Sequence, residues 1–204
     1  MIVVLISGRG SNLQALLDAS LPVSAVISDQ AGAKGLDVAA ARGIATRVVE
    51  HRGFASREAF DAELARQIDG YRPRGVALAG FMRVLTAGFV ERYRERLLNI
   101  HPSLLPAFGG LDTHRRALAA GVKLHGCTVH FVTPQLDQGP IVIQAALRVR
   151  PAETPEALAA RVLRLEHFVY PRAVRWLLDG RLVIAQGVVH VQGDDAQQLH
   201  ISPD

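Results

Sequence analysis

Apolar residues along this chain follow two patterns, short continuous runs and positions spaced by three or four residues. Ile2–Ile6 is a continuous run rich in β-branched residues, which is typical of a strand buried on both faces. Phe60, Leu64 and Ile68 recur every four residues and predict a helix with one buried face. Further strands are predicted at residues 23–28, 46–49, 76–79 and 97–100, and further helices at 34–42 and 86–94. Strands that alternate with helices over short connections predict an α/β fold with a mainly parallel, doubly wound sheet.

The second half of the chain changes character. It is predicted to hold helices at residues 113–120 and 155–179 and strands at 129–132, 141–149, 182–185 and 188–191. The first two of these strands are too close in sequence for a helix between them, so antiparallel strands are expected in this half. Pro171 is expected to kink or break the long helix, and Gln186-Gly187 predicts a hairpin. We therefore predict a single domain over residues 1–192 and a frayed polar tail at 193–204.

Composition narrows the class of protein. Apolar residues make up 49% and charged residues 21% of the 204 residues, as in ordinary globular proteins. Cys127 is the only cysteine, which excludes an internal disulfide and a thiolate metal cluster and fits a cytoplasmic protein. The apolar N-terminus is too short for a signal peptide, and no run of about 18 apolar residues predicts a membrane span. The net charge of +4 comes from scattered residues. This distribution favours a basic surface without a specific ligand, or a site for small anions, over a nucleic-acid-binding surface.

A glycine-rich loop follows the first predicted strand. Residues 7–12 read Ser-Gly-Arg-Gly-Ser-Asn and precede a helical pattern, so backbone N–H groups and a helix dipole would converge there on an anion. Leu13 stands where a dinucleotide loop needs its third glycine, and the Lys-Ser/Thr of an ATP loop is absent. A mononucleotide or sugar phosphate is therefore the favoured ligand. The alternative is a tight turn with Ser11 as a helix cap, completed by Gln14 in a capping box.

Two segments carry groups suited to acyl chemistry. Asn99 and His101 stand two residues apart where a buried strand ends, so their side chains would point to the same face of that strand. An amide and an imidazole can together stabilise an oxyanion, and an imidazole can move a proton near neutral pH. Asp137, in a turn between two strands, could reach His101 and raise the pKa of its imidazole. The alternatives are a surface histidine at a capped strand end and an ordinary turn aspartate.

Together these segments resemble a known family. In order along the chain they are Gly8-x-Gly10-Ser11-Asn12-Leu13-Gln14, Leu78-Ala79-Gly80-Phe81-Met82-Arg83, Asn99-Ile100-His101-Pro102-Ser103-Leu104-Leu105-Pro106, Leu136-Asp137-x-Gly139-Pro140 and Glu166-His167. This set is similar to that of the folate-dependent phosphoribosylglycinamide formyltransferases over about residues 1–190. The resemblance implies a Rossmann-like formyltransferase fold with a nucleotide- and phosphate-binding half at 1–100 and a folate and catalytic half at 101–192.

The resemblance also implies roles for individual positions. The catalytic residues would be Asn99, His101 and Asp137. The ribonucleotide-binding residues would be Gly10, Ser11, Asn12 and Glu166. The folate-binding residues would be Arg57, Met82, Arg83, Val84, Leu85, Asn99, Thr133, Pro134, Gln135, Leu136 and Asp137. Considered without the resemblance, several of these have plainer interpretations: Met82, Val84 and Leu85 as core residues, and Arg57 and Glu166 as surface charges on helices.

The implied reaction is transfer of the formyl group of 10-formyltetrahydrofolate, a co-substrate, to the amine of N1-(5-phosphoribosyl)glycinamide in de novo purine (IMP) biosynthesis. No metal, nucleic acid or membrane partner is expected, and the protein would be a monomer or a homodimer.

Three positions depart from the family's pattern, and they put substrate affinity and pH optimum in doubt more than reaction type. Asp112 stands where a histidine is expected, Leu163 where a polar substrate contact is expected, and Ala107 where lysine is usual. Rival functions are formyltetrahydrofolate hydrolysis, methionyl-tRNA formylation, non-catalytic binding of nucleotide or folate, and NAD-dependent redox chemistry. The first two would normally bring an additional domain, the intact trio argues against a pure binder, and Leu13 argues against NAD.

Overall fold

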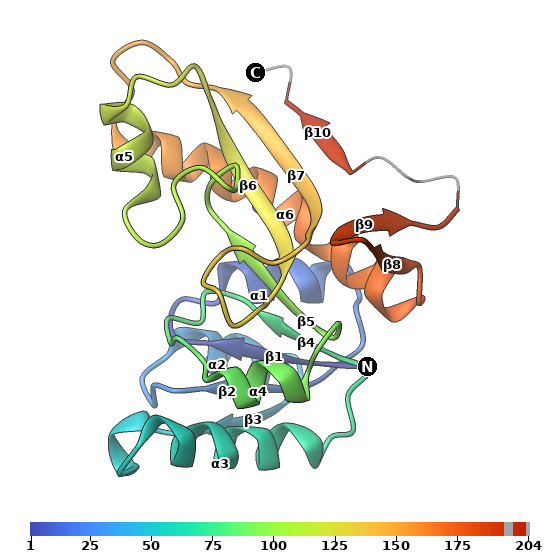
Figure 1. The fold of residues 1–204 in the computed structure, drawn as a ribbon. Coiled ribbons are helices and arrows are strands. Elements are labelled where there is room, and N and C mark those ends of the chain that lie inside the picture. Colours follow the sequence, from blue (N-terminus) through green and yellow to red (C-terminus); the bar gives the residue numbers. More distant parts are fainter. Residues whose placement is uncertain (194–197, 203–204) are drawn as a thin grey trace. The chain divides into compact units, whose positions relative to one another are not determined.

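The structure is a computed structural model, which describes residues 1–193 and 198–202. The chain forms two compact units, Met1–Asn99 and Ile100–Asp204, and each is described by itself (Figure 1).

The first unit is built on a parallel sheet. Its strands are β1 (Ile2–Ile6), β2 (Val23–Ser28), β3 (Ala45–Val48), β4 (Gly75–Leu78) and β5 (Leu97–His101), the last of which continues two residues into the second unit. They lie in the order β5-β4-β1-β2-β3, and every pair is parallel. All five residues of β1 are fully buried. The predicted parallel sheet with alternating helices is thereby confirmed.

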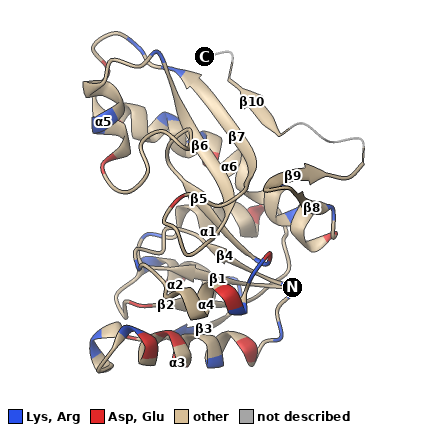
Figure 2. Ribbon diagram, viewed as in Figure 1, with Lys and Arg blue, Asp and Glu red and all other residues tan. Residues whose placement is uncertain are grey.

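Four α-helices connect these strands. They are α1 (Ser11–Asp18), α2 (Lys34–Ala41), α3 (Arg57–Asp69) and α4 (Ala87–Arg92), and a short 3-10 helix, η1 (His51–Gly53), precedes α3. Helices α1 and α2 contact one another, and so do α3 and α4. Figure 1 shows α1 and α3 on opposite sides of the strands of this unit. Acidic and basic residues both occur along α3 (Figure 2), while Phe60, Leu64 and Ile68 are buried, as their spacing predicted.

The predicted capping box at the start of α1 is wrong. Ser11 is the first helical residue, and the N-cap is Gly10, which has a left-handed backbone with φ of 77° and provides no side-chain cap. A Cβ on Gly10 would lie 2.6 Å from the Cα of Gly35, so close packing against α2 also requires glycine. Side-chain caps occur instead at Ser56 and Thr86, whose hydroxyls accept bonds from the backbone at the starts of α3 and α4.

The second unit contains antiparallel strands, as predicted. Its elements are α5 (Thr113–Ala119), β6 (Leu124–Phe131), β7 (Ile141–Arg148), α6 (Pro155–Leu178), β8 (Leu182–Ala185), β9 (Val188–Val191) and β10 (Leu199–Ile201). Strands β6 and β7 pair antiparallel, and α6 packs against both. The β8–β9 hairpin is also as predicted, and Gln186 and Gly187 both have positive φ in its turn, as the Asn-Gly type of hairpin turn requires.

Other elements of this unit differ from prediction. Strand β6 begins five residues before the predicted start at 129, because Gly126 and two polar residues interrupt the apolar run. That glycine is required, since a Cβ there would lie 1.8 Å from the Ala145 carbonyl oxygen. Strand β10, which pairs with β7, was not predicted. Residues 194–197 and 203–204 of the predicted frayed tail lie outside the described residues.

Pro171 does not break α6. The helix runs through it without interruption for 24 residues. An interior proline costs roughly 3 kcal/mol in an isolated helix. Here Pro171 itself is buried, as are Val162, Val169 and Val174 on the same helix, and burial of each such side chain contributes roughly 1.5–3 kcal/mol. Tertiary packing therefore outweighs the local cost.

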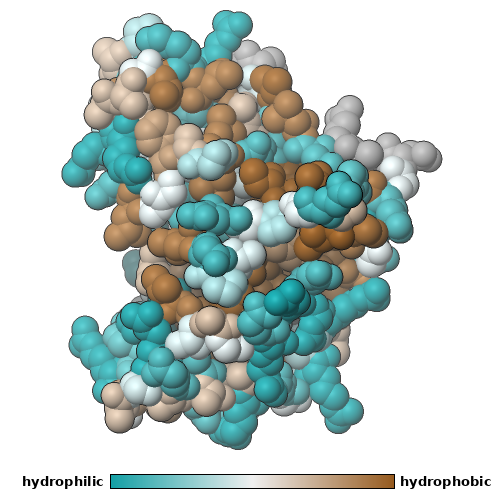
Figure 3. All heavy atoms as spheres, in the orientation of Figure 1, coloured by the Kyte–Doolittle hydropathy of each residue, from teal (hydrophilic) through white to brown (hydrophobic). Residues whose placement is uncertain are grey.

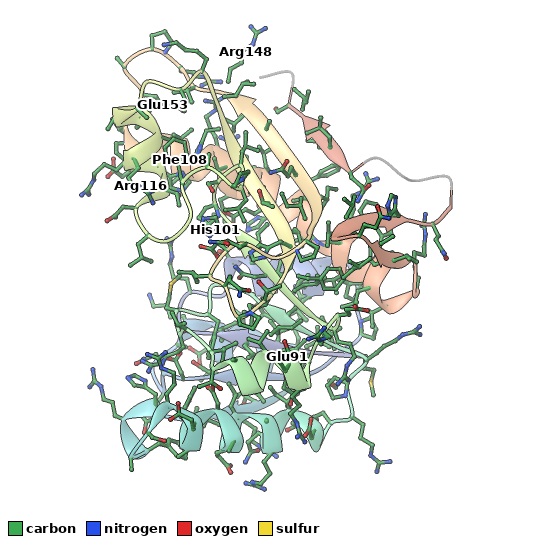
Figure 4. All side chains as sticks on the ribbon, in the orientation of Figure 1. Glu91, His101, Phe108, Arg116, Arg148 and Glu153 are labelled. Atoms are coloured by element: carbon green, nitrogen blue, oxygen red, sulfur yellow. The ribbon has the colours of Figure 1, made fainter. Side chains whose placement is uncertain are left out.

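A buried ion pair holds the segment between β7 and α6. Arg161 donates to the Glu153 carboxylate at 2.9 Å and to the Arg148 carbonyl oxygen at 3.0 Å, and both ion-pair side chains are at least 92% buried (Figure 4). Burial alone would raise the pKa of Glu153, but hydrogen bonds from the Arg150 N–H and from Arg161 outweigh burial and lower it. The folded state is therefore stabilised by the ionised carboxylate.

We expect Glu153→Gln to lower the free energy of unfolding at neutral pH by about 1.5 kcal/mol, the scale of a hydrogen bond to a charged group. Because folding lowers the pKa of Glu153, its contribution is complete above the ordinary glutamate value of 4.5 and is lost as the pH falls further. Urea unfolding at pH 7 and pH 3 measures both effects, with Glu91→Gln, in an exposed pair with Arg94, as the control. If Glu153→Gln lowers the free energy of unfolding by the same amount at pH 7 and at pH 3, this account is wrong.

The described residues include no helix that is both long and apolar enough to cross a membrane. Large apolar side chains nevertheless remain exposed, among them Met82, Leu111 and Leu136. On the face shown in Figure 3, apolar surface is interspersed with hydrophilic residues.

Candidate active site

The predicted histidine and aspartate meet in the second unit. His101 is the last residue of β5, and its Nδ1 lies 3.5 Å from Oδ2 of Asp137. Its Nε2 lies 3.1 Å from the carbonyl oxygen of Phe108. Both side chains of the pair are only 8% exposed. Because oxygen acceptors face both ring nitrogens, the arrangement suits an imidazolium, which can donate at each nitrogen.

Asp137 is held in place by backbone geometry as well as by this pair. It lies in the turn between β6 and β7 with φ of 54°, a left-handed conformation that aspartate tolerates better than most residues. The Gly110 N–H donates to Asp137 Oδ2 at 2.8 Å. His130 Nε2 lies 3.8 Å from the other carboxylate oxygen. The carboxylate therefore faces one group from each of three segments: the end of β5, the loop that follows it, and β6.

Three further histidines surround this pair. Burial lowers the pKa of His130, and it outweighs the opposing effects of the Phe131 carbonyl and the Asp137 charge. Burial and the nearby His101 lower the pKa of His114. Burial and the nearby His114 lower the pKa of His125 to about 4. His114 Nδ1 and His125 Nε2 lie 3.2 Å apart, a distance that requires one of the two nitrogens to be unprotonated. These three imidazoles are therefore neutral at pH 7.

We expect the His125 imidazole to remain neutral down to about pH 5, because its folded-state pKa is about 4. The unfolded chain would bind this proton near pH 6.5, so His125 should destabilise the fold as the pH falls from about 6.5 toward 4. An NMR titration of the ring protons, assigned with His125→Gln, measures the value. A midpoint near 6.5 would contradict the inferred burial.

In the first unit, the segment after β4 is tied to the loop after β1. Ser7 donates its backbone N–H to the Gly80 carbonyl at 3.1 Å, and its hydroxyl accepts from the Met82 N–H at 2.9 Å. A pocket of about 580 Å³ lies beside these contacts. The residues that line it are Ser7, Gly8, Arg9, Asp29, Gln30, Gly32, Ala33, Lys34, Met82 and Arg83. Arginine and lysine side chains thus border a hollow next to the predicted phosphate loop.

The predicted ribonucleotide-binding residues fall in both units. Gly10 is the N-cap of α1, and Ser11 and Asn12 are its first two residues, with Asn12 buried. Glu166 is buried on α6 in the second unit, so its interpretation as a solvated surface charge is wrong. Its charge adds to burial in raising the pKa of Cys127.

The predicted folate-binding residues of the first unit are mostly exposed. Met82 is 71% and Val84 53% exposed, so neither is a core residue, whereas Leu85 is buried. The Arg83 guanidinium lies 5.8 Å from the centre of the Phe60 ring, within the range of a cation–π contact. Arg57 is exposed at the first position of α3.

In the second unit, Thr133, Pro134, Gln135 and Leu136 lead into the Asp137 turn. The Thr133 hydroxyl donates to the Gln135 carbonyl at 3.1 Å, and Leu136 is 58% exposed. Asp112, the unexpected acid, lies at the start of α5 beside a separate hollow of about 210 Å³.

Sequence reasoning missed the groups that hold the pair in position. Phe108 and Gly110 contribute a carbonyl oxygen and an N–H, which any residue type can supply, so the side chains gave no signal. The Gly109-Gly110 dipeptide could have indicated an unusual turn, and Gly110 indeed has φ of 79°. Within the described residues, we find no group of three His, Cys, Asp or Glu side chains arranged to hold a metal ion.

Comparisons with known proteins place the chain in one family. The family model described as formyl transferase matches residues 1–174. The phosphoribosylglycinamide formyltransferase of Escherichia coli (strain K12) is 49% identical over 198 residues, which cover 94% of this chain and 93% of that protein. The structure of phosphoribosylglycinamide formyltransferase from Coxiella burnetii is 45% identical, covers 98% of both chains and has a TM-score of 0.92. A formyltetrahydrofolate deformylase from Pseudomonas syringae is 28% identical with a TM-score of 0.87, over 94% of this chain and 65% of that one. The chain belongs to the formyl transferase family.

Proposed function

We propose that this chain transfers the formyl group of 10-formyltetrahydrofolate to the amine of N1-(5-phosphoribosyl)glycinamide, a step of purine biosynthesis. The observation that carries the proposal is the buried His101–Asp137 pair at the end of β5, with Asn99 two residues earlier on the same strand. The names of the E. coli and Coxiella relatives, at 49% and 45% identity over nearly the whole chain, support this acceptor.

In the proposed mechanism the substrate's own amine is the nucleophile, so the protein supplies no covalent residue. Asn99 donates a hydrogen bond to the formyl oxygen as attack turns it into an oxyanion. His101 donates a second from Nε2, which exchanges the Phe108 carbonyl for this oxygen when the substrates bind. Removal of one such donor costs roughly 2.7–4 kcal/mol in other enzymes. Asp137 faces Nδ1 of His101 at 3.5 Å and stabilises its protonated form by opposite charge.

The bonds and protons that change in this step belong to two nitrogens, the acceptor amine and the folate nitrogen that carries the formyl group. A bond forms between the acceptor amine and the formyl carbon, and the bond between that carbon and the folate nitrogen breaks. The attacking amine loses one proton, and the departing folate nitrogen gains one. We assign the transfer of this proton to His101 and Asp137, because an imidazole can accept and release a proton near neutral pH.

Binding of the two substrates is assigned to the remaining predicted residues. Gly10, Ser11 and Asn12 at the start of α1 would hold the phosphate, since the N-terminus of a helix favours an anion. Glu166 would contact the glycyl amine. The folate would be bound by Arg57 and residues 82–85 of the first unit and by residues 133–137 of the second. We propose that the protein lies in the cytoplasm and that its partners are small molecules. We propose that its oligomeric state is a monomer or a homodimer.

The test mixes the protein with 10-formyltetrahydrofolate and follows the folate absorbance with and without the ribonucleotide. Deformylation that requires the ribonucleotide supports the proposal. Deformylation without it would point instead to the hydrolysis named for the Pseudomonas neighbour. No reaction in either mixture would overturn the proposal.

A further inference from the structure

Both members of the buried pair depend on one loop, residues 107–112. His101 Nε2 faces the carbonyl oxygen of Phe108 at 3.1 Å, and the Gly110 N–H donates to Asp137 Oδ2 at 2.8 Å. Displacement of this loop would therefore remove a partner from the imidazole and from the carboxylate at the same time.

The loop has a backbone that needs external support. Phe108, Gly110 and Asp112 have φ values of 56°, 79° and 56°. A bulky residue such as Phe108 rarely adopts such an angle, whereas glycine and aspartate tolerate it better. Its first residue is held from inside the unit, where the Ser103 hydroxyl donates to the Ala107 carbonyl at 2.7 Å. The far end is exposed, since Leu111 is 78% accessible.

Arg116, on α5, makes the contacts that hold the exposed end. Its Nη1 donates to the Gly109 carbonyl at 2.6 Å and to the Leu111 carbonyl at 3.2 Å. Its guanidinium also lies 5.8 Å from the centre of the Phe108 ring (Figure 4). One side chain thus contacts three of the six residues of the loop. These residues lie on both sides of Gly110, whose N–H donates to the Asp137 carboxylate.

We propose that Arg116 is a positioning residue that fixes the 107–112 loop and, through it, the orientation of His101 and Asp137. This inference deepens the proposed function, because it assigns a further residue to the same site. The planar guanidinium suits the task, since it can donate to backbone carbonyls in its own plane while its face lies against an aromatic ring. The ammonium of lysine lacks that planar face.

Arg115 provides a matched control on the same helix. It is an exposed arginine one residue away, and no hydrogen bond or ion pair of its side chain is described. Arg116→Ala should lower kcat at least about fivefold with KM for the ribonucleotide within about twofold, whereas Arg115→Ala should change neither. For scale, a 1 Å misplacement of reacting groups can cost roughly 100-fold. The kcat of Arg116→Lys should be close to that of Arg116→Ala. Added guanidinium ion at millimolar concentration should restore part of the kcat that Arg116→Ala has lost.

Hydrogen exchange of the amides of residues 107–112 measures the loop independently of activity. The amides of this loop, including that of Gly110, should exchange faster in Arg116→Ala than in the wild type. In Arg115→Ala they should exchange at the wild-type rate. Unchanged turnover, or lowered turnover without faster exchange, would overturn the proposal, and so would an equal effect of Arg115→Ala. If the wild-type protein transfers no formyl group, the proposed function fails while the exchange result still decides whether Arg116 holds the loop. Arg116→Gln repeats both measurements should the alanine variant fail to fold.

Discussion

Replacement of His101 by alanine is expected to lower turnover at least about tenfold, which corresponds to roughly 1.4 kcal/mol of activation barrier. In the proposed mechanism the imidazole donates to the developing oxyanion and moves the proton, and alanine can do neither. Binding of the ribonucleotide should be largely unchanged, because its proposed phosphate site at the start of α1 is made of other residues. Steady-state kinetics and calorimetric titration with the ribonucleotide measure the two quantities separately.

The same loss is expected for Asp137→Ala, which removes the carboxylate that faces Nδ1 of His101. His190→Ala provides the control, since His190 is an exposed histidine on β9. It should retain wild-type turnover and the same melting temperature. Near-normal turnover in either His101→Ala or Asp137→Ala would remove that residue from the mechanism, provided that circular dichroism shows both variants folded.

Gly139→Ala is expected to destabilise the second unit by about 3 kcal/mol, at the upper end of the range for overpacking. A Cβ on Gly139 would lie 1.7 Å from the carbonyl oxygen of Phe131, a backbone atom that cannot rotate away. The neighbouring bond from the Phe131 N–H to the Pro140 carbonyl, at 2.9 Å, fixes the two strands at this point. The turn must therefore move, and Asp137 lies in that turn.

Turnover of Gly139→Ala should consequently fall together with its stability. Gly88→Ala is the matched control, because Gly88 lies inside helix α4 with nothing within 4 Å of the added methyl group. That substitution should raise the free energy of unfolding by up to about 1 kcal/mol through helix propensity. Urea unfolding of both variants gives the comparison, and a Gly139→Ala protein as stable as wild type would show that the turn can relax.

The errors in the predicted fold have a common physical origin. The capping box at Ser11 failed because close packing of Gly10 on Gly35 set the backbone there, and the sequence carries no sign of that approach. The predicted break at Pro171 failed because burial along α6 outweighs a local cost. Both are cases in which tertiary packing overrides a local preference.

The site was predictable only to the extent that side chains carry its chemistry. Asn99, His101 and Asp137 were predicted as catalytic from residue type and motif, and of this prediction the closeness of His101 and Asp137 is confirmed at 3.5 Å. Phe108, Gly110 and Arg116 were not identified, because they act through backbone groups or on them, and residue type does not reveal where a carbonyl points.

The sequence by itself therefore determined most of the elements and the class of this protein. Buried apolar runs define β1 and β2 to the residue, and period-four apolar positions define α3, because these patterns reflect which faces lose contact with water. Only the tertiary structure decided which backbone groups meet His101 and Asp137 and which loop carries them. Those contacts join segments far apart in the chain, and they depend on dihedral angles and close approaches that emerge only when the strands and helices pack.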